Sequence, residues 1–318
     1  MTSCFPTDNL VPYAMTVDVN GDIWASGNFR VNQYDGGTFA ELAQISVPGI
    51  GLCLAADSAG YIYYGGYGGS PSAISTIVKI DVSTKQPVAT MTVALGIRVI
   101  VYDGTYLWVT GDTSGVNPAL LKINPATMTV IASGIAGING GSALAMNGNG
   151  TKLWFADPLE SNLYSVNLST LQVDFTVFLS GPPYSLLTIP GNRLFVGSQS
   201  SVLMLDAISG GSLAPPATIF LLTVGDLAFD GVNVWACNFD GNGVTRIDPS
   251  TNTVTGGVVT ADGGYRPRSL AVGCRLWVGH ETLLLAPGNI ALVNVFTNSV
   301  DCAPCESSID WSFGMLEF

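Results

Sequence analysis

The stretch CRLWVGHETL at residues 274–283 holds the only histidine of the chain, His280, and an acid, Glu281, follows it directly. A histidine oriented by a carboxylate can act as a general base, and such a pair can also contribute to a metal site. Adjacent residues on a strand point to opposite faces, so these two would cooperate only where the strand has ended. We therefore assign no catalytic residue beyond the candidates His280 and Glu281, and we expect His280 to be a partly buried, hydrogen-bonded loop residue.

Cysteine chemistry is the second possibility. The six cysteines show neither two close pairs nor a pair with histidines, the spacings typical of zinc sites; they are Cys4, Cys53, Cys237, Cys274, Cys302 and Cys305. The CAPC sequence at 302–305 resembles a redox motif, but that chemistry needs a strand entering a helix, and the sequence predicts no helix there. We expect these thiols to be structural or inert, with a disulfide from the CAPC pair to Cys4 as the alternative.

Composition excludes several partners. Charged residues make up 11% of the 318 residues and the net charge is −12, so the basic footprint that nucleic acids and anionic membranes require is missing. No run of about 18 apolar residues predicts a transmembrane helix. Residues 1–10 have neither the basic nor the apolar part of a signal peptide. Three explanations fit: a signal peptide already removed, a protein that stays in the cytoplasm, or exit by another route, such as a virus particle released by lysis. We expect a protein located in a virion or outside the cell.

The elements that would position any site come from a repeat. A sequence motif, which we call the first phrase, recurs about every 42 residues. It consists of an apolar strand, a polar turn, and an aliphatic residue followed by an aromatic one, as in AMTVDVNGDIWASG at 14–27 and LAFDGVNVWACN at 227–238. Five of the six tryptophans fall in this register. We expect its aromatic positions to be structural wedges between sheets: Trp24, Tyr63, Trp108, Trp154, Phe195, Trp235 and Trp277.

A second phrase follows each first one, as in IVKIDVSTKQPVATMTV at 77–93 and VTRIDPSTNTVTGGVV at 244–259. Two hairpins per unit make four short antiparallel strands, and repetition without helices is typical of a β-propeller, which leaves only short protected edges. We predict an all-β fold, a seven-bladed β-propeller over residues 13–305. Its blades are about 13–48, 49–94, 95–138, 139–180, 181–222, 223–264 and 265–305.

The phrases resemble those of the NHL, YVTN and virginiamycin B lyase-like propeller superfamily. The resemblance rests on Asp18, Gly21 and Trp24, on Asp57, Gly60 and Tyr63, and on residues 244–255, and it extends over nearly the whole chain. It implies a propeller but no single function. A lyase of the virginiamycin B type implies a histidine base, Mg²⁺ held by carboxylates and a second histidine, and this chain has one histidine.

In a propeller the loops between second and third strands share one face with the connections between blades, around the central channel. We expect a ligand site on this face, for a glycan or a peptide. Its predicted residues are Tyr67, Asp112, Asp157, Tyr184, Asp240, Tyr265, Arg266 and Arg268, with Asp226 and Arg98 beside them. Several carboxylates there could also hold Ca²⁺ or Mg²⁺, because these cations prefer oxygen ligands. The alternative is that all are solvated loop residues.

Residues 1–12 and 306–318 fall outside the repeat. The segment ESSIDWSFGMLEF at 306–318 alternates Ile309, Trp311, Phe313 and Met315 along one face, and a free apolar strand would be a liability. We expect 306–318 to pair at the ring seam or with a partner chain, and 1–12 to lie near the seam. The sequence favours a non-enzymatic binding or assembly module, such as a phage structural or receptor-binding protein. The alternatives are a metal-assisted lyase or hydrolase, and a peptide-binding scaffold.

Overall fold

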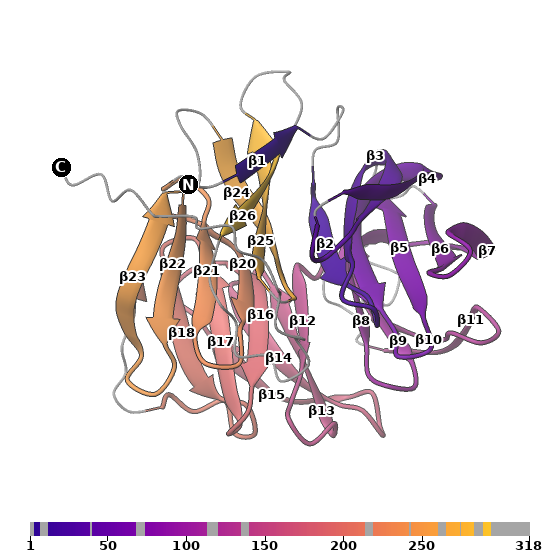
Figure 1. Ribbon diagram of the computed structural model, residues 1–318. Helices are drawn as coiled ribbons and strands as arrows, with labels where there is room; N and C mark the ends of the chain where they lie inside the picture. The colour runs from indigo at the N-terminus through magenta and orange to yellow at the C-terminus, as the bar shows by residue number, and fades with distance from the viewer. Residues whose placement is uncertain are drawn as a thin grey trace.

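A computed structural model describes residues 3–6, 12–38, 40–67, 74–112, 120–134, 140–213, 219–241, 243–259, 265–273, 275–282 and 289–293. All regular structure in these residues is β-strand, and the sheets stand side by side around a common axis (Figure 1). The predicted all-β β-propeller is therefore confirmed. In this described part of the chain, no helix has the length and apolar character that a membrane crossing needs.

Five sheets have four strands each. In four of them the strands lie in the order in which they follow one another along the chain, and the fifth joins one strand from the start of the sequence to three consecutive later strands. The first holds β8 (Gly96–Tyr102), β9 (Leu107–Asp112), β10 (Leu120–Asn124) and β11 (Thr129–Gly134). The second holds β12 (Ala143–Met146), β13 (Lys152–Asp157), β14 (Asn162–Asn167) and β15 (Val173–Phe178). The third holds β16 (Pro183–Ile189), β17 (Arg193–Ser198), β18 (Ser201–Asp206) and β19 (Ile219–Phe220).

The fourth sheet holds β20 (Val224–Phe229), β21 (Val234–Asn238), β22 (Gly243–Asp248) and β23 (Thr253–Val259). The fifth combines β24 (Tyr265–Val272), β25 (Leu276–Thr282) and β26 (Asn289–Val293) with β1 (Ser3–Pro6) from the other end of the sequence. β1 pairs antiparallel with β26, with Ser3 opposite Leu292. In Figure 1 the indigo β1 lies beside the yellow β26. Residues 3–6 thus lie where the two ends of the described ring meet.

The remaining sheet has six strands: β2 (Ala14–Val17), β3 (Ile23–Tyr34), β4 (Glu41–Ala56), β5 (Tyr61–Tyr67), β6 (Ser75–Asp81) and β7 (Gln86–Val93). The chain turns back within β3. A hydrogen bond shows this reversal, since Gln33 Nε2 donates to Asp22 Oδ2 at 3.0 Å. An extended run of that length would hold the two about 35 Å apart. The reversal lies near Phe29, whose φ is 59°. The strand assignment therefore gives six separate sheets, whereas the sequence predicts seven of four strands.

A hydrogen-bonded aspartate recurs in several sheets and stabilises the turn before the strand that carries the repeat aromatic. Oδ1 of Asp57 accepts bonds from the backbone N–H groups of Ala59 and Tyr61, and its Oδ2 accepts a 2.8 Å bond from the Tyr63 hydroxyl. In three other turns the indole Nε1 replaces the hydroxyl, in the pairs Trp24–Asp18, Trp108–Asp103 and Trp235–Asp230. Each such aspartate holds both a turn and a buried aromatic ring, so the turn and the core form together.

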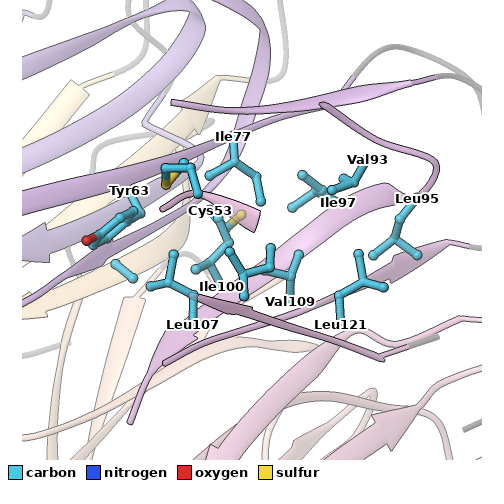
Figure 2. Close-up of a cluster of buried hydrophobic side chains, with 13 residues drawn as sticks. Cys53, Tyr63, Ile77, Val93, Leu95, Ile97, Ile100, Leu107, Val109 and Leu121 are labelled. Carbon is cyan, nitrogen blue, oxygen red and sulfur yellow. The ribbon is translucent and has the colours of Figure 1, made fainter. Parts of the chain in front are cut away.

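The core lies between neighbouring sheets. Figure 2 shows one such layer, in which Cys53, Tyr63 and Ile77 on one side face Ile100 and Val109 on the other. All seven aromatic residues of the repeat are at most 2% exposed: Trp24, Tyr63, Trp108, Trp154, Phe195, Trp235 and Trp277. A face of each sheet is thus covered by the next, as expected for a ring of stacked sheets.

The ring closes through β24, which packs against β20 on one side and β2 on the other. Side chains join these sheets: the Ser269 hydroxyl donates to the Pro12 carbonyl at 3.0 Å, and Asp226 accepts a 2.8 Å bond from the Leu270 N–H. The segment 306–318 and the cysteines 302 and 305 lie outside the described residues. Cys53 and Cys237 are buried free thiols.

Candidate binding site at the channel mouth

The start of each first strand lies beside the end of the second strand in the same sheet. Gly96 pairs with Asp112 in this way, and Pro183 pairs with Ser198. The connections between sheets and the loops between second and third strands therefore share one face, which we call the loop face. This is the arrangement on which the predicted site depends.

Bulges interrupt the first strands where they leave this face. The pairing register shifts around Leu52, Arg98, Tyr184 and Arg268, and again between Val224 and Leu227. A bulge adds one residue to a strand and re-aims its side chain. The four bulged residues all line a single cavity, so the bulges turn these side chains toward the ring axis.

This channel cavity has a volume of about 250 Å³. It is lined from β2, β4, β8, β12, β16, β20 and β24, together with residues just before them. The lining residues are Tyr13, Ala14, Met15, Leu52, Cys53, Leu54, Arg98, Val99, Ile100, Ser142, Ala143, Leu144, Tyr184, Ser185, Leu186, Gly225, Asp226, Arg268 and Ser269. The first residue of each segment lies nearest the loop face, and two of these are arginines and two are tyrosines.

A second cavity of about 330 Å³, the side pocket, opens beside the first and shares Arg98, Ser142 and Tyr184 with it. Asp112, Gly140, Gly141, Pro158, Leu159 and Pro182 complete its lining. Arg98 Nε lies 2.7 Å from Asp112 Oδ1. This bond raises the pKa of the Arg98 guanidinium, and Tyr67 lies near the same side chain. The predicted residues Tyr67, Asp112 and Tyr184 are thus gathered around one arginine.

A second group forms on the other side of the channel. Arg266 Nη2 lies 3.5 Å from Asp240 Oδ1, and the Arg266 guanidinium stacks 5.0 Å from the centre of the Phe239 ring. The Arg268 guanidinium lies 4.8 Å from the Tyr13 ring centre. Three more predicted residues are therefore on the loop face, but their contacts are distinct from those of the side pocket.

Two predicted residues contribute less. Asp157 is fully buried, and its Oδ1 accepts the N–H groups of Leu159 and Glu160, so it holds the turn after β13. Burial raises its pKa, and its Oδ2 has no hydrogen-bond partner among the described residues. Tyr265 begins β24, and its side chain lies outside the described residues.

His280 lies in β25, with Pro267 and Asn289 opposite it. It is 1% exposed, and burial lowers the pKa of its imidazole to about 4. A general base works best with a pKa near the operating pH, and this imidazole is far below that. Glu281 pairs with Arg266 through the backbone, and its side chain lies outside the described residues.

Among the described side chains, the carboxylates do not meet as a cation site. Within the described ranges, no three His, Cys, Asp or Glu side chains lie close enough together to hold a metal ion. Asp226 lies in the wall of the channel cavity, and burial raises its pKa to about 6 although two backbone N–H groups bind it. Asp112, Asp226 and Asp240 each bind another partner through at least one carboxylate oxygen.

Exposed apolar side chains also gather on the loop face. Phe178 at the end of β15 is 81% exposed and Leu159 after β13 is 71% exposed. Phe29 and Leu222, in loops of the same face, are 63% and 60% exposed. Leu159 lines the side pocket and Phe178 lies across the adjacent hairpin. Apolar side chains exposed together next to a pocket are typical of a surface that meets another molecule.

Sequence reasoning missed Tyr13, Leu159 and Phe178. Met15 pairs with the residue that follows the repeat aromatic, and Tyr13 stands two residues before Met15. Arg98, Tyr184 and Arg268 each stand two residues before the equivalent residue of their own sheet. Aligning the repeats on that pairing would have found Tyr13. The sequence carries no comparable signal for Leu159 and Phe178, because only the structure shows that they lack neighbours.

No protein-family profile and no curated protein matches the chain. Among solved structures, the Cps50 (Swd1) β-propeller domain of Myceliophteria thermophila is similar, with a TM-score of 0.72 and 11% identity over 93% of this chain and 100% of that one. Hydrazine synthase of Kuenenia stuttgartiensis is similar with a TM-score of 0.75 and 14% identity, over 92% and 98% of the two chains. At these identities the likeness concerns the fold alone.

Proposed function

We propose that this protein is a non-enzymatic binding module of a larger assembly, and that it holds a peptide segment of a protein partner at the channel mouth. The observation that carries this proposal is the side pocket, where an arginine with exposed donors adjoins Pro158, Leu159, Pro182 and Tyr184. A pocket with apolar walls and few polar groups is the usual form of a ligand site.

We infer that the ring has seven blades. The six-stranded sheet supports this count, because β3 folds back on itself and β4 pairs first with β3 and then with β5, which makes two four-stranded units. Seven innermost segments also contribute to the channel cavity. The relationship to the NHL, YVTN and virginiamycin B lyase-like superfamily remains a proposal that rests on the sequence phrases.

A peptide suits the loop face better than a glycan does. Leu159 and Phe178 are aliphatic or aromatic, are more than two-thirds exposed, and lack polar groups that could bind sugar hydroxyls. Among the described residues, nothing specifically favours the lyase or hydrolase alternative, because His280 is buried with a pKa lowered to about 4.

The larger assembly, on this proposal, is a virion or an extracellular structure. The low content of charged residues and the net charge of −12 support a location away from nucleic acid. Mass spectrometry of purified particles, medium and cell lysate from the producing culture tests it. Enrichment in the lysate alone would remove this part of the proposal and leave the binding site standing.

The binding role can be tested without knowing the partner. A library of displayed random peptides is selected on the immobilised full chain, and the enriched peptides are then measured by fluorescence anisotropy on variants. Arg98→Ala and Tyr184→Ala should each weaken binding at least tenfold. Val232→Ser, in the turn between β20 and β21 on the opposite face and 48% exposed in the wild type, is the matched control and should bind normally.

Either of two results contradicts the proposal. Selection that enriches no peptide above the background of an unrelated protein removes the peptide-binding role. Enriched peptides that bind the Arg98 and Tyr184 variants as tightly as the wild type show that another surface is used. Thermal unfolding of each variant verifies that it is folded.

A further inference from the structure

Arg98 presents donors that the fold does not use. Its Nε is held by Asp112 at 2.7 Å, and its side chain is 46% exposed at the edge of the side pocket. In the part of the chain that the structure describes, no other hydrogen bond or ion pair engages the Nη groups. A guanidinium fixed on one side offers its outer edge to a carboxylate in two-point geometry.

Apolar groups stand directly beside this edge. Pro158, Leu159, Pro182 and Tyr184 line the same pocket. Phe178 lies opposite Asn162, across the hairpin whose turn contains Leu159. The site therefore suits a segment in which apolar side chains adjoin a carboxylate. A surface with a net charge of −12 gives an anionic segment few other places to dock.

The segment 306–318 of this chain has that chemistry. It contains three acids, no basic residue, and five large apolar side chains between residues 309 and 316. In an extended strand, alternate residues share a face. Phe313, Met315 and Glu317 then lie on one face, with the acid next to the apolar pair. The charge and the apolar pattern both complement the side pocket.

We infer that residues 306–318 of a second copy of this chain dock in the side pocket, with Glu317 against Arg98 and Met315 against Leu159. This inference rests on the proposed function and names its partner. The contact joins two different surfaces, so it is heterologous and adds copies head to tail. The protein would build the assembly of which it is part.

The last described residues lie on the other side of the ring from the side pocket. Val293, the last described residue, pairs with Leu276 at the end of the sheet remote from the loop face. Its sheet packs between those of β2 and β20, on the other side of the channel from the side pocket. The residues 294–314, which precede Met315, could span about 70 Å. The mass of the particle in solution, and not the reach of the chain, therefore separates docking on a second copy from docking on the chain's own pocket.

The test is light scattering of the full chain over a range of concentrations. The wild type should exceed the single-chain mass of 33.1 kDa increasingly as concentration rises. Arg98→Glu and Glu317→Arg should each restore the single-chain mass, and the double variant Arg98→Glu/Glu317→Arg should associate again. Arg246→Glu, a charge reversal on the exposed side chain that bonds Thr255, is the matched control and should associate as the wild type does.

Several outcomes overturn the inference: a wild type of 33.1 kDa at every concentration, or association that survives both single reversals. A synthetic peptide of residues 306–318 adds a direct measurement. It should bind the Glu317→Arg full chain and fail to bind once Arg98→Glu is added. Glu317→Arg changes no residue of the described sheets, so it still gives an answer if Arg98→Glu unfolds. Library peptides that need Arg98, together with a 306–318 peptide that does not bind, would remove this inference and retain the proposed function.

Discussion

The hydrogen bond between Tyr63 and Asp57 allows a quantitative prediction about what stabilises the repeat. The hydroxyl donates to Oδ2 at 2.8 Å, Tyr63 is fully buried and Asp57 is 6% exposed. A hydrogen bond to a charged group contributes about 1.5–3 kcal/mol, and a buried carboxylate oxygen left without its donor costs a similar amount. Tyr63→Phe should therefore lower the free energy of unfolding by about 2 kcal/mol.

A double-mutant cycle isolates this bond. Asp57→Ala also loses two backbone bonds to Oδ1, so it should destabilise more than Tyr63→Phe does. In the Asp57→Ala background, however, Tyr63→Phe should cost almost nothing, because the acceptor is already gone. Tyr64→Phe is the control. Its hydroxyl donates to the Gly49 carbonyl, so it should lose about 1 kcal/mol in either background.

The assay is urea unfolding of the four cycle variants and the control pair at neutral pH, with stability taken by linear extrapolation. Equal costs of Tyr63→Phe in both backgrounds would refute the reasoning, since the contribution of the hydroxyl would then not depend on Asp57. A cost below about 0.5 kcal/mol in the wild-type background would do the same, because it lies outside the range for a buried, charge-assisted bond.

Three further predictions concern buried groups. Burial raises the pKa of Asp226 to about 6, so the folded state favours the protonated carboxyl over the carboxylate. The free energy of unfolding should therefore fall by about 3 kcal/mol as pH rises from 4 to 6, and the urea midpoint of Asp226→Asn should lack this loss. Because burial lowers the pKa of His280 to about 4, stability should fall by about 3 kcal/mol as pH drops from 6.5 to 4, and His280→Gln should remove that loss. The two slopes oppose each other between pH 4 and 6, so each variant should reveal the slope of the other group, and a flat profile in both variants would disprove the assignment. Gly65→Ala should lower the free energy of unfolding by about 1–3 kcal/mol, because its methyl group would overlap Cys53 Sγ and lie 2.8 Å from Ile97 Cγ2. Adding Cys53→Ala should recover part of the loss, and a Gly65→Ala variant that unfolds at the wild-type temperature would contradict this packing.

The fold was accessible from the sequence because its signals repeat. The aspartate, the glycine and the aromatic residue recur about every 42 residues, and each has a local physical role in a turn or in the core. The sheet boundary inside β3 was less accessible. It depends on Phe29 adopting a positive φ without a glycine, and no sequence pattern marks that position.

The candidate site was predicted only in outline. Asp112, Tyr184 and Arg98 meet as the loop-face argument expects, because strand order alone brings those positions to one end of the sheets. Asp157 shows the limit of that argument. A carboxylate just after a strand can face solvent or fold back to bind its own turn, and the side-chain rotamer decides this, not the spacing.

The pairing of β1 with β26 constrains the order in which the strands of the ring can assemble. Ser3–Pro6 leaves the ribosome before the other described strands, yet its partner, Asn289–Val293, is among the last described residues to be made. Joining segments so distant in sequence costs about 5 kcal/mol of chain entropy if nothing between them is folded. Each sheet completed in the meantime shortens the distance still to be closed. The first described strand to be synthesised can therefore take its place in the sheet only after β26 has been made.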